Sequence, residues 1–303
     1  MGRHLGSRLL REGHHVRCFS RSEGVHSDGI INGACTHQLI DFRDQVDFRP
    51  LIDGCDTVIQ LISTRIPSSS NADPIADVTE NLIPMLRLFK AMPECGIKKF
   101  IFPSSGGTVY GNPRYQPIDE EHPTNPIVSY GATKLAIEKF AHAHLGSQDI
   151  KTTILRISNP YGPGFSIGSP QGAIGSFLHQ AINNSPITIW GDGNVVRDYI
   201  YIDDVMESFL AALRYNGPET IFNISTGRGH SLLDIVKEIE IAIERPVVLN
   251  FREGRAFDVS SNILSNNRAC TQLNWHPDTS LQTGLVHTAT WLKGQIISSD
   301  KSL

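Results

Sequence analysis

The sequence predicts an α/β fold, in which a doubly wound parallel sheet is followed by a smaller mixed α/β lobe. In the first half of the chain, short runs rich in Val, Ile, Thr and Phe alternate with longer runs of helical period, which predicts the sheet. From about residue 159 Gly and Pro cluster, which indicates a change of organisation. We therefore expect residues 1–160 to form the first domain and residues 161–303 a second lobe, partly interleaved with the first.

The elements of the first domain follow from local composition and period. Strands are predicted over His15–Ser20, Thr57–Ser63, Lys99–Ser105 and Thr152–Ser158. Helices are predicted over Arg3–Glu12, Asp77–Glu94 and Tyr130–Leu145, the last with an apolar stripe of Ala132, Leu135, Ala136 and Phe140. Strand–helix alternation predicts a parallel sheet with helices on both faces, and ligands bind beyond the carboxyl ends of such strands.

The second lobe is predicted to begin with a long loop over Asn159–Gly175, because this segment is rich in Gly and Pro. Short strands are then predicted over Ile187–Trp190, Ile221–Ile224 and Val247–Phe251. Helices are predicted over Asp204–Tyr215, Leu232–Ile243 and Leu281–Gly294.

Composition excludes several classes of protein. The formal net charge of -4 argues against a nucleic-acid partner, which requires a basic surface. No apolar stretch approaches the roughly 20 residues that span a bilayer, and no secretory signal opens the chain. The 5 cysteines are scattered, which favours reduced thiols in a cytoplasmic protein over disulfides or zinc. We expect no metal site, because even the nearest helical histidines, His142 and His144, face different directions.

The opening of the chain indicates a nucleotide-binding helix without its preceding strand. Gly2 matches the last glycine of a G-x-x-G-x-x-G loop, and helix Arg3–Glu12 follows it. We expect a strand and glycine loop of roughly 10–15 residues to precede Met1. The alternative is a sheet that has no such strand.

Tyr130 and Lys134 form a YxxxK pair at the start of a helix, where residues i and i+4 share one face. A lysine ammonium beside a phenol favours the phenolate, so we expect the pKa of Tyr130 to be lowered toward neutrality. Such a tyrosine serves as an acid and base, while the lysine can also bind a ribose hydroxyl. The pair alone occurs often by chance, but here it follows a Ser- and Gly-rich strand end, Phe102–Gly111.

Further segments make the assignment specific. These segments are Asn159–Gly164, Gly191–Gly193, Arg197–Asp204 and Asn223–Gly227. With them, the YxxxK pair and Phe102–Gly111 resemble the NAD-dependent epimerase/dehydratase family. This family is of the extended short-chain dehydrogenase/reductase type and has a Rossmann-type sheet. The nearest members are similar to UDP-glucose 4-epimerase, an isomerase of nucleotide-sugar metabolism. The resemblance covers nearly the whole chain and says more about the family than about the substrate.

The resemblance implies a catalytic group built on Tyr130, which takes the proton from a sugar hydroxyl while bound NAD removes hydride, with Lys134 beside it. The third member is normally a Ser or Thr, yet Gly106 stands at that position, so Thr108 or Ser105 must replace it and we favour Thr108. Family dehydratases carry an Asp-Glu pair where this chain has Gly107 and Thr108. The resemblance therefore favours epimerisation over dehydration.

The resemblance also implies residues that bind a nucleotide sugar, which we expect to be UDP-linked, and residues that bind the cofactor. The substrate residues are Asn159, Arg197, Arg255 and Asp258. The cofactor residues are Gly2, Ser20, Arg21, Asp41, Ser63 and Asn81, besides Tyr130 and Lys134. NAD-specific members usually carry an acid at the end of the second strand, where this chain has Ser20 and Arg21, and an arginine there can accept the 2′-phosphate of NADP. NADP is therefore possible, but the resemblance to epimerases favours NAD.

Three hypotheses remain open from the sequence. An epimerase retains its cofactor and produces no net oxidation. An NADP-dependent nucleotide-sugar reductase or dehydratase of the same family consumes NADPH. A non-catalytic nucleotide-binding relative is favoured by Gly106 and by the missing first strand. Family members often form homodimers through the YxxxK helix, and we expect the same here.

Overall fold

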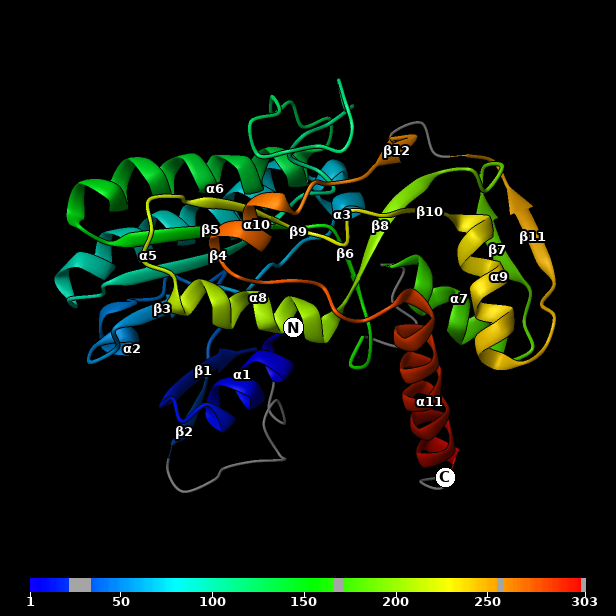
Figure 1. Cartoon of the computed structure of the whole chain (residues 1–303). Coiled ribbons are helices and arrows are strands. Elements are labelled where there is room, and N and C mark those ends of the chain that lie inside the picture. Colours follow the sequence, from blue (N-terminus) through cyan, green and yellow to red (C-terminus); the bar gives the residue numbers. More distant parts are fainter. Residues whose placement is uncertain (22–33, 166–171, 255–258, 301–303) are drawn as a thin grey trace.

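The computed structural model describes residues 1–21, 34–165, 172–254 and 259–300, with side chains up to residue 297. Its main sheet has four parallel strands in the order β3 (Thr57–Ile59), β4 (Lys99–Ser105), β5 (Lys151–Ile157) and β9 (Ile221–Ile224). Six of the seven residues of β4 are buried, since helices cover both faces of the sheet. The predicted parallel α/β sheet is thus confirmed, and Figure 1 shows its strands side by side.

A second, two-stranded sheet is formed by β1 (Val16–Ser20) and β2 (Cys35–Leu39), which pair in parallel. The sequence analysis did not predict β2, because its sequence, CTHQL, has neither an apolar run nor a clear alternation. Among the described residues, no ladder joins this pair to β3. Helix α1 (Gly2–Arg11) contacts β1 and also α8 (Ile202–Arg214), which connects this unit to the rest of the molecule. A strand before Met1 stays a prediction.

One face of the main sheet is covered by α5 (Ile83–Glu94) and α6 (Ser129–Leu145), and α8 packs against β4 and β5. The predicted helix Asp77–Glu94 is three consecutive pieces: α4 (Pro74–Asp77), a π-helix η1 (Val78–Leu82) and α5. Ile83 donates its N–H to the carbonyl of Val78, five residues back. Pro84 has no N–H to continue an α-helical ladder, which explains the wider turn.

The apolar stripe predicted on α6 faces outward. Ala132 and Phe140 are exposed, and Leu135 and Ala136 are half-buried. The buried face instead carries Gly131, Thr133, Lys134, Ile137, Glu138, Ala141 and Leu145. Helix α6 therefore directs a partly polar face at the sheet and a partly apolar face at the surface.

The second lobe contains two small sheets. In one, β8 (Val196–Tyr201) lies between β10 (Gly229–Ser231) and β12 (Ser261–Asn262) and also pairs with β6 (Asn159–Tyr161). In the other, β7 (Ile187–Trp190) pairs in parallel with β11 (Leu249–Arg252). The remaining described α-helices are α2 (Arg49–Ile52), α3 (Pro67–Ala72), α7 (Ala173–Ile182), α9 (Leu232–Ile243), α10 (Asn267–Gln272) and α11 (Leu281–Asp300), and a short 3-10 helix, η2 (Gly146–Gln148), follows α6. The expected loop over Asn159–Gly175 thus begins with a strand and ends inside a helix.

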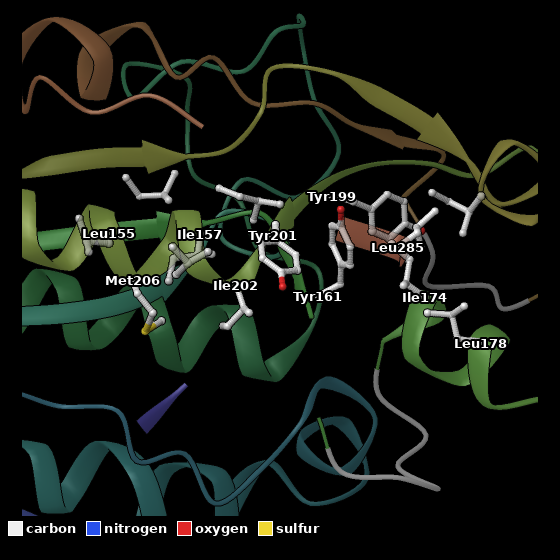
Figure 2. Packing of buried hydrophobic residues seen from close by; sticks show 14 of the residues in the cluster. Leu155, Ile157, Tyr161, Ile174, Leu178, Tyr199, Tyr201, Ile202, Met206 and Leu285 are labelled. Carbon is white, nitrogen blue, oxygen red and sulfur yellow. The ribbon is translucent and has the colours of Figure 1, made fainter. Parts of the chain in front are cut away.

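Aromatic and aliphatic side chains pack together in this lobe, and their cluster continues to Leu155 and Ile157 of β5 in the first domain. Figure 2 shows Tyr161 and Tyr201, whose ring centroids lie 5.7 Å apart, between Ile202 of α8 and Ile174 of α7. Strand β9 follows β6, β7 and β8 in sequence yet belongs to the main sheet. None of the helices in the described ranges is both long and apolar enough to cross a membrane.

Candidate active site

The site lies where α6 starts, against the loop that follows β4. Val128 is extended, with φ -131° and ψ 145°, and precedes the first helical residue. A Cβ at Gly131 would lie 2.6 Å from the carbonyl oxygen of Thr108, so only glycine allows the helix to approach this loop so closely. The close approach places Tyr130 beside the carboxyl end of β4.

Tyr130 and Lys134 occupy the same side of α6 and line one small cavity of about 10 Å³. The Nζ atom of Lys134 lies 5.6 Å from the ring centroid of Tyr130, 4.6 Å from that of Phe102, and donates to the carbonyl oxygen of Pro103 at 3.2 Å. The other lining residues are Gln60, Ile62, Ser63, Asp77, Asn81, Met85, Thr133 and Ile137. The structure therefore brings together the YxxxK pair with two predicted cofactor residues, Ser63 and Asn81.

The prediction of an acidic phenol is wrong for the chain alone. Burial raises the pKa of Tyr130 to about 12, and although a hydrogen bond from Ser63 acts to lower it, the charge of Asp77 raises it further. The ammonium of Lys134 lies over the ring rather than against the hydroxyl, which explains its weak effect on the phenol. An additional positive charge beside Tyr130 is needed to make its phenolate accessible near neutral pH.

The pKa of Lys134 is lowered to about 8, because burial disfavours its ammonium form. The negative charges of Asp77 and Glu138 oppose this effect. A lysine with this pKa is still largely protonated at neutral pH, as a hydrogen-bond donor must be.

Asn81 fixes the segment that follows β3. It is 6% exposed; its Oδ1 accepts from the N–H of Thr64 at 3.0 Å, and its Nδ2 donates to Asp77 Oδ1 at 2.9 Å. Ser63, one residue before Thr64, is exposed and donates to the carbonyl oxygen of Arg65. Asn81 therefore holds Ser63 and its neighbours at the mouth of the cavity.

Gly106, Thr108 and Ser105 lie where the sequence predicts the third catalytic hydroxyl. A Cβ at Gly106 would lie 2.3 Å from Leu264 Cδ1, so no side chain fits at this position without displacing Leu264. Oγ1 of Thr108 is buried and has no hydrogen-bond partner in the described part of the chain. A Cβ at Gly107 would lie 4.0 Å from both Ser105 Oγ and Asn159 Oδ1, so these two side chains converge over Gly107.

Three of the predicted cofactor residues, Ser20, Arg21 and Asp41, lie at the carboxyl ends of β1 and β2. Ser20 Oγ lies 2.7 Å from His37 Nε2, and exposed Arg21 follows the strand. Asp41 accepts from Arg43 Nε at 2.9 Å, and these hydrogen bonds lower the pKa of Asp41 to about 2. The structure thus places Ser20, Arg21 and Asp41 at one edge, away from Tyr130.

Of the predicted substrate residues, two are described. Asn159 on β6 donates to the carbonyl oxygen of Asp198 at 3.1 Å. Arg197 on β8 is half-buried and donates to the carbonyl oxygens of Val196 and Val259, at 2.9 and 2.6 Å. Arg255 and Asp258 lie outside the described residues.

Comparison with known proteins decides the family. The sequence model of the NAD dependent epimerase/dehydratase family matches residues 1–225. The chain belongs to this family. A dTDP-4-dehydro-6-deoxyglucose reductase of Escherichia coli is 37% identical over 76% of the chain and 72% of its own length. A UDP-glucose 4-epimerase of Mycolicibacterium smegmatis is 29% identical over 97% of the chain and 96% of its own length.

Solved structures of the family share the fold. A Thermus thermophilus UDP-glucose 4-epimerase, in complex with NAD, superposes with a TM-score of 0.87 at 27% identity, covering 97% of this chain and 96% of that one. The similarity extends over both the main sheet and the second lobe.

Sequence reasoning missed two groups of residues in this epimerase/dehydratase-family site. The first is Asp77, which lines the cavity four residues before Asn81, a helical spacing that points both at one face. The second is a buried network in which Arg156 donates to Glu138 at 2.7 Å and to Tyr110 Oη at 3.0 Å, and Tyr110 donates to Asn223 at 2.7 Å. Glu138 follows Lys134 by four residues, which was the available signal.

Proposed function

We propose that the protein is a nucleotide-sugar epimerase of the UDP-hexose 4-epimerase type that uses NAD as its cofactor. The observation that supports this most directly is the cavity shared by Tyr130, Lys134, Ser63 and Asn81 at the carboxyl ends of β3 and β4. UDP-glucose 4-epimerases that match the chain over nearly its full length support the same reaction.

The residues present fit a dinucleotide. Gly2 lies at the start of α1, where a Cβ would be 3.9 Å from Leu61 Cδ1, so this helix begins beside the end of β3. The N-terminus of α1 has no side-chain cap and no acidic residue in its first turn, which suits a pyrophosphate. Asp41, with Ser20 or Arg21, would bind the adenosine half, and Ser63, Asn81 and Lys134 the nicotinamide half.

Bound NAD would supply a hydride acceptor and a positively charged ring. Tyr130 would accept the proton of the sugar hydroxyl at Oη and return it after the oxidised sugar has rotated in the site. Lys134 has three N–H donors, and Pro103 is its hydrogen-bond acceptor among the described residues, which leaves donors for ribose hydroxyls. Thr108, or else Ser105, would hold the reacting hydroxyl, since Thr108 Oγ1 lacks a partner among the described residues.

The second lobe would bind the rest of a UDP-linked substrate. Asn159 approaches Gly107 from β6 and faces the catalytic loop. Arg197 and Arg255 would contact the diphosphate, because a planar guanidinium can bind two phosphate oxygens at once. Asp258 would contact the ribose of the nucleotide. In the domain division that we propose, residues 1–160 bind dinucleotide and residues 161–303 bind substrate, with Asn159 contributing to the substrate site from the boundary.

The test is turnover of UDP-glucose by the whole chain with NAD. We expect UDP-galactose to form, detected by chromatography, while the near-ultraviolet absorbance of reduced nicotinamide shows no stoichiometric change. Formation of one reduced nicotinamide per sugar converted would contradict the epimerase assignment.

A second candidate is a reductase of a dTDP-linked 4-dehydro sugar. The 37% identity to the Escherichia coli reductase favours it, and Arg21 at the end of β1 would suit the 2′-phosphate of NADP. The same assay separates the two: a reductase oxidises NADPH stoichiometrically with a dTDP-4-dehydro sugar. We place either reaction in the cytoplasm, since all five cysteines are free thiols.

We also propose a homodimer formed through α6 and its neighbours. Exposed apolar side chains lie on adjacent helices, with Phe140 37% exposed on α6, Ile75 78% on α4 and Ile83 37% on α5. A second copy would cover this surface, which holds no predicted substrate or cofactor residue except at the start of α6. Light scattering is expected to give twice the chain mass, and Ile75→Asp with Phe140→Asp to give the monomer. Ile241→Asp, at an exposed position of α9, is the matched control and should stay dimeric.

A further inference from the structure

Asp77 is a buried carboxylate that sequence reasoning did not assign to the reaction. It is 1% exposed, and its carboxylate accepts from two neutral groups: Asn81 Nδ2 at 2.9 Å and Thr133 Oγ1 at 3.0 Å. Within the part of the chain that the structure describes, no cation forms an ion pair with Asp77. A buried carboxylate without a counter-ion is costly, so its persistence calls for a nearby positive charge.

Lys134 is that charge. It directly follows Thr133, it borders the same cavity as Asp77, and its ammonium is favoured by the charge of Asp77. The cavity measures about 10 Å³, room for about one water, so bulk solvent does not screen the two groups from one another.

Other charges near Lys134 are already matched. Glu138, one turn further along α6, accepts from Arg156 of β5 through Nε and Nη2, so its charge is compensated. Glu80 of η1 pairs with Arg65 at 2.7 Å. Tyr130 is neutral near pH 7, because burial raises its pKa. Asp77 is therefore the carboxylate in the described lining of this cavity whose charge is left for Lys134.

We propose that Asp77 is a positioning residue of the proposed epimerase: its charge retains the ammonium of Lys134, while its hydrogen bond orients Asn81 toward the cofactor. This inference rests on the proposed function. It assigns Asp77 no contact with substrate and no proton transfer. Through Asn81 and Thr133, it links η1 to α6 across the cavity.

The test measures the titration of Lys134 directly. In protein labelled with [13Cε]-lysine, the Lys134 resonance is identified by its loss in Lys134→Arg, and its shift is followed with pH. Asp77→Asn removes the charge and is expected to lower the pKa of Lys134 by about one pH unit from about 8. The ammonium, present below the pKa, is then lost at a lower pH, so the alkaline limb of kcat should move down by the same amount. Turnover at pH 8 should fall roughly fivefold.

Control variants separate charge from structure. Glu80→Gln removes a carboxylate three residues away in the same segment and should leave the titration unchanged. Thr133→Val removes a hydrogen bond but retains the charge, and should move the titration far less than Asp77→Asn. If Asp77→Asn does not fold, Asp77→Ser removes the same charge with a smaller side chain.

Two results would overturn the proposal: an unchanged Lys134 titration when the Asp77 charge is removed, or an equal shift in Thr133→Val. The spectroscopic measurement needs no turnover. A failure of the proposed function would therefore appear as an inactive wild-type chain, whatever Lys134 does in the spectra.

Discussion

Replacing Tyr130 by phenylalanine is expected to lower epimerase turnover by about 10²–10⁴-fold, the usual contribution of a positioned general acid and base. The phenylalanine retains the ring beside Lys134 and removes only the hydroxyl, so the fold and the cofactor should be kept. The pKa of the Tyr130 phenol is about 12 in the chain alone. We therefore expect turnover to depend on bound NAD, because the positively charged nicotinamide ring would favour the phenolate. Initial rates with UDP-glucose at saturating substrate measure the loss.

Tyr115→Phe is the matched control for this variant. Tyr115 is 45% exposed, and its hydroxyl donates to Asp119 at 2.8 Å, away from the cavity. We expect its turnover to stay within about twofold of the wild type, as for surface changes generally. If Tyr130→Phe retained the same turnover as Tyr115→Phe, Tyr130 would not be the acid and base.

Replacing Glu138 by glutamine is expected to lower the free energy of unfolding by about 3–5 kcal/mol. Glu138 and Arg156 are each 2% exposed and joined at 2.7 Å, and Ser104 also donates to this carboxylate. Without the carboxylate charge, the guanidinium of Arg156 stays buried with only the hydroxyl of Tyr110 and an amide as partners. Urea unfolding followed by circular dichroism measures the change.

A surface ion pair provides the comparison for Glu138. Glu12 and Arg214 lie 2.8 Å apart, with side chains 35% and 66% exposed. Glu12→Gln should cost no more than about 1 kcal/mol, because water solvates both partners. Equal losses in the two variants would show that the buried pair contributes no more than the exposed one.

Much of the fold was predictable because local signals determine it. Lys99–Ser105, Ile187–Trp190, Ile221–Ile224 and Leu232–Ile243 have the predicted bounds. The last begins where Ser231 and Asp234 form a capping box, which fixes a helix start in sequence. Cys35–Leu39 was missed because its strand conformation depends on pairing with Val16–Ser20 rather than on its own composition.

The site was predictable where one helix determines it. Tyr130 and Lys134 share a face through their spacing alone, whatever surrounds them. The pKa of Tyr130 was predicted in the wrong direction because it depends on burial, which only the packing of α6 against β4 determines. Asp77 was missed for the same reason, since an aspartate on a helix is usually exposed. The outward-facing stripe of α6 shows the converse: apolar spacing identifies a face but not what covers it.

The place of β9 limits how this architecture can be altered. Ile221–Ile224 complete the sheet beside β5, pairing Ile154 with Ile221 and Ile157 with Ile224, after the chain has already formed β7 and β8 of the second lobe. Cutting after residue 160 would remove the edge strand of the main sheet and expose the backbone of β5 to unintended pairing. New sugar specificity is therefore more readily grafted by exchanging single loops than by transplanting the carboxyl-terminal half as one block.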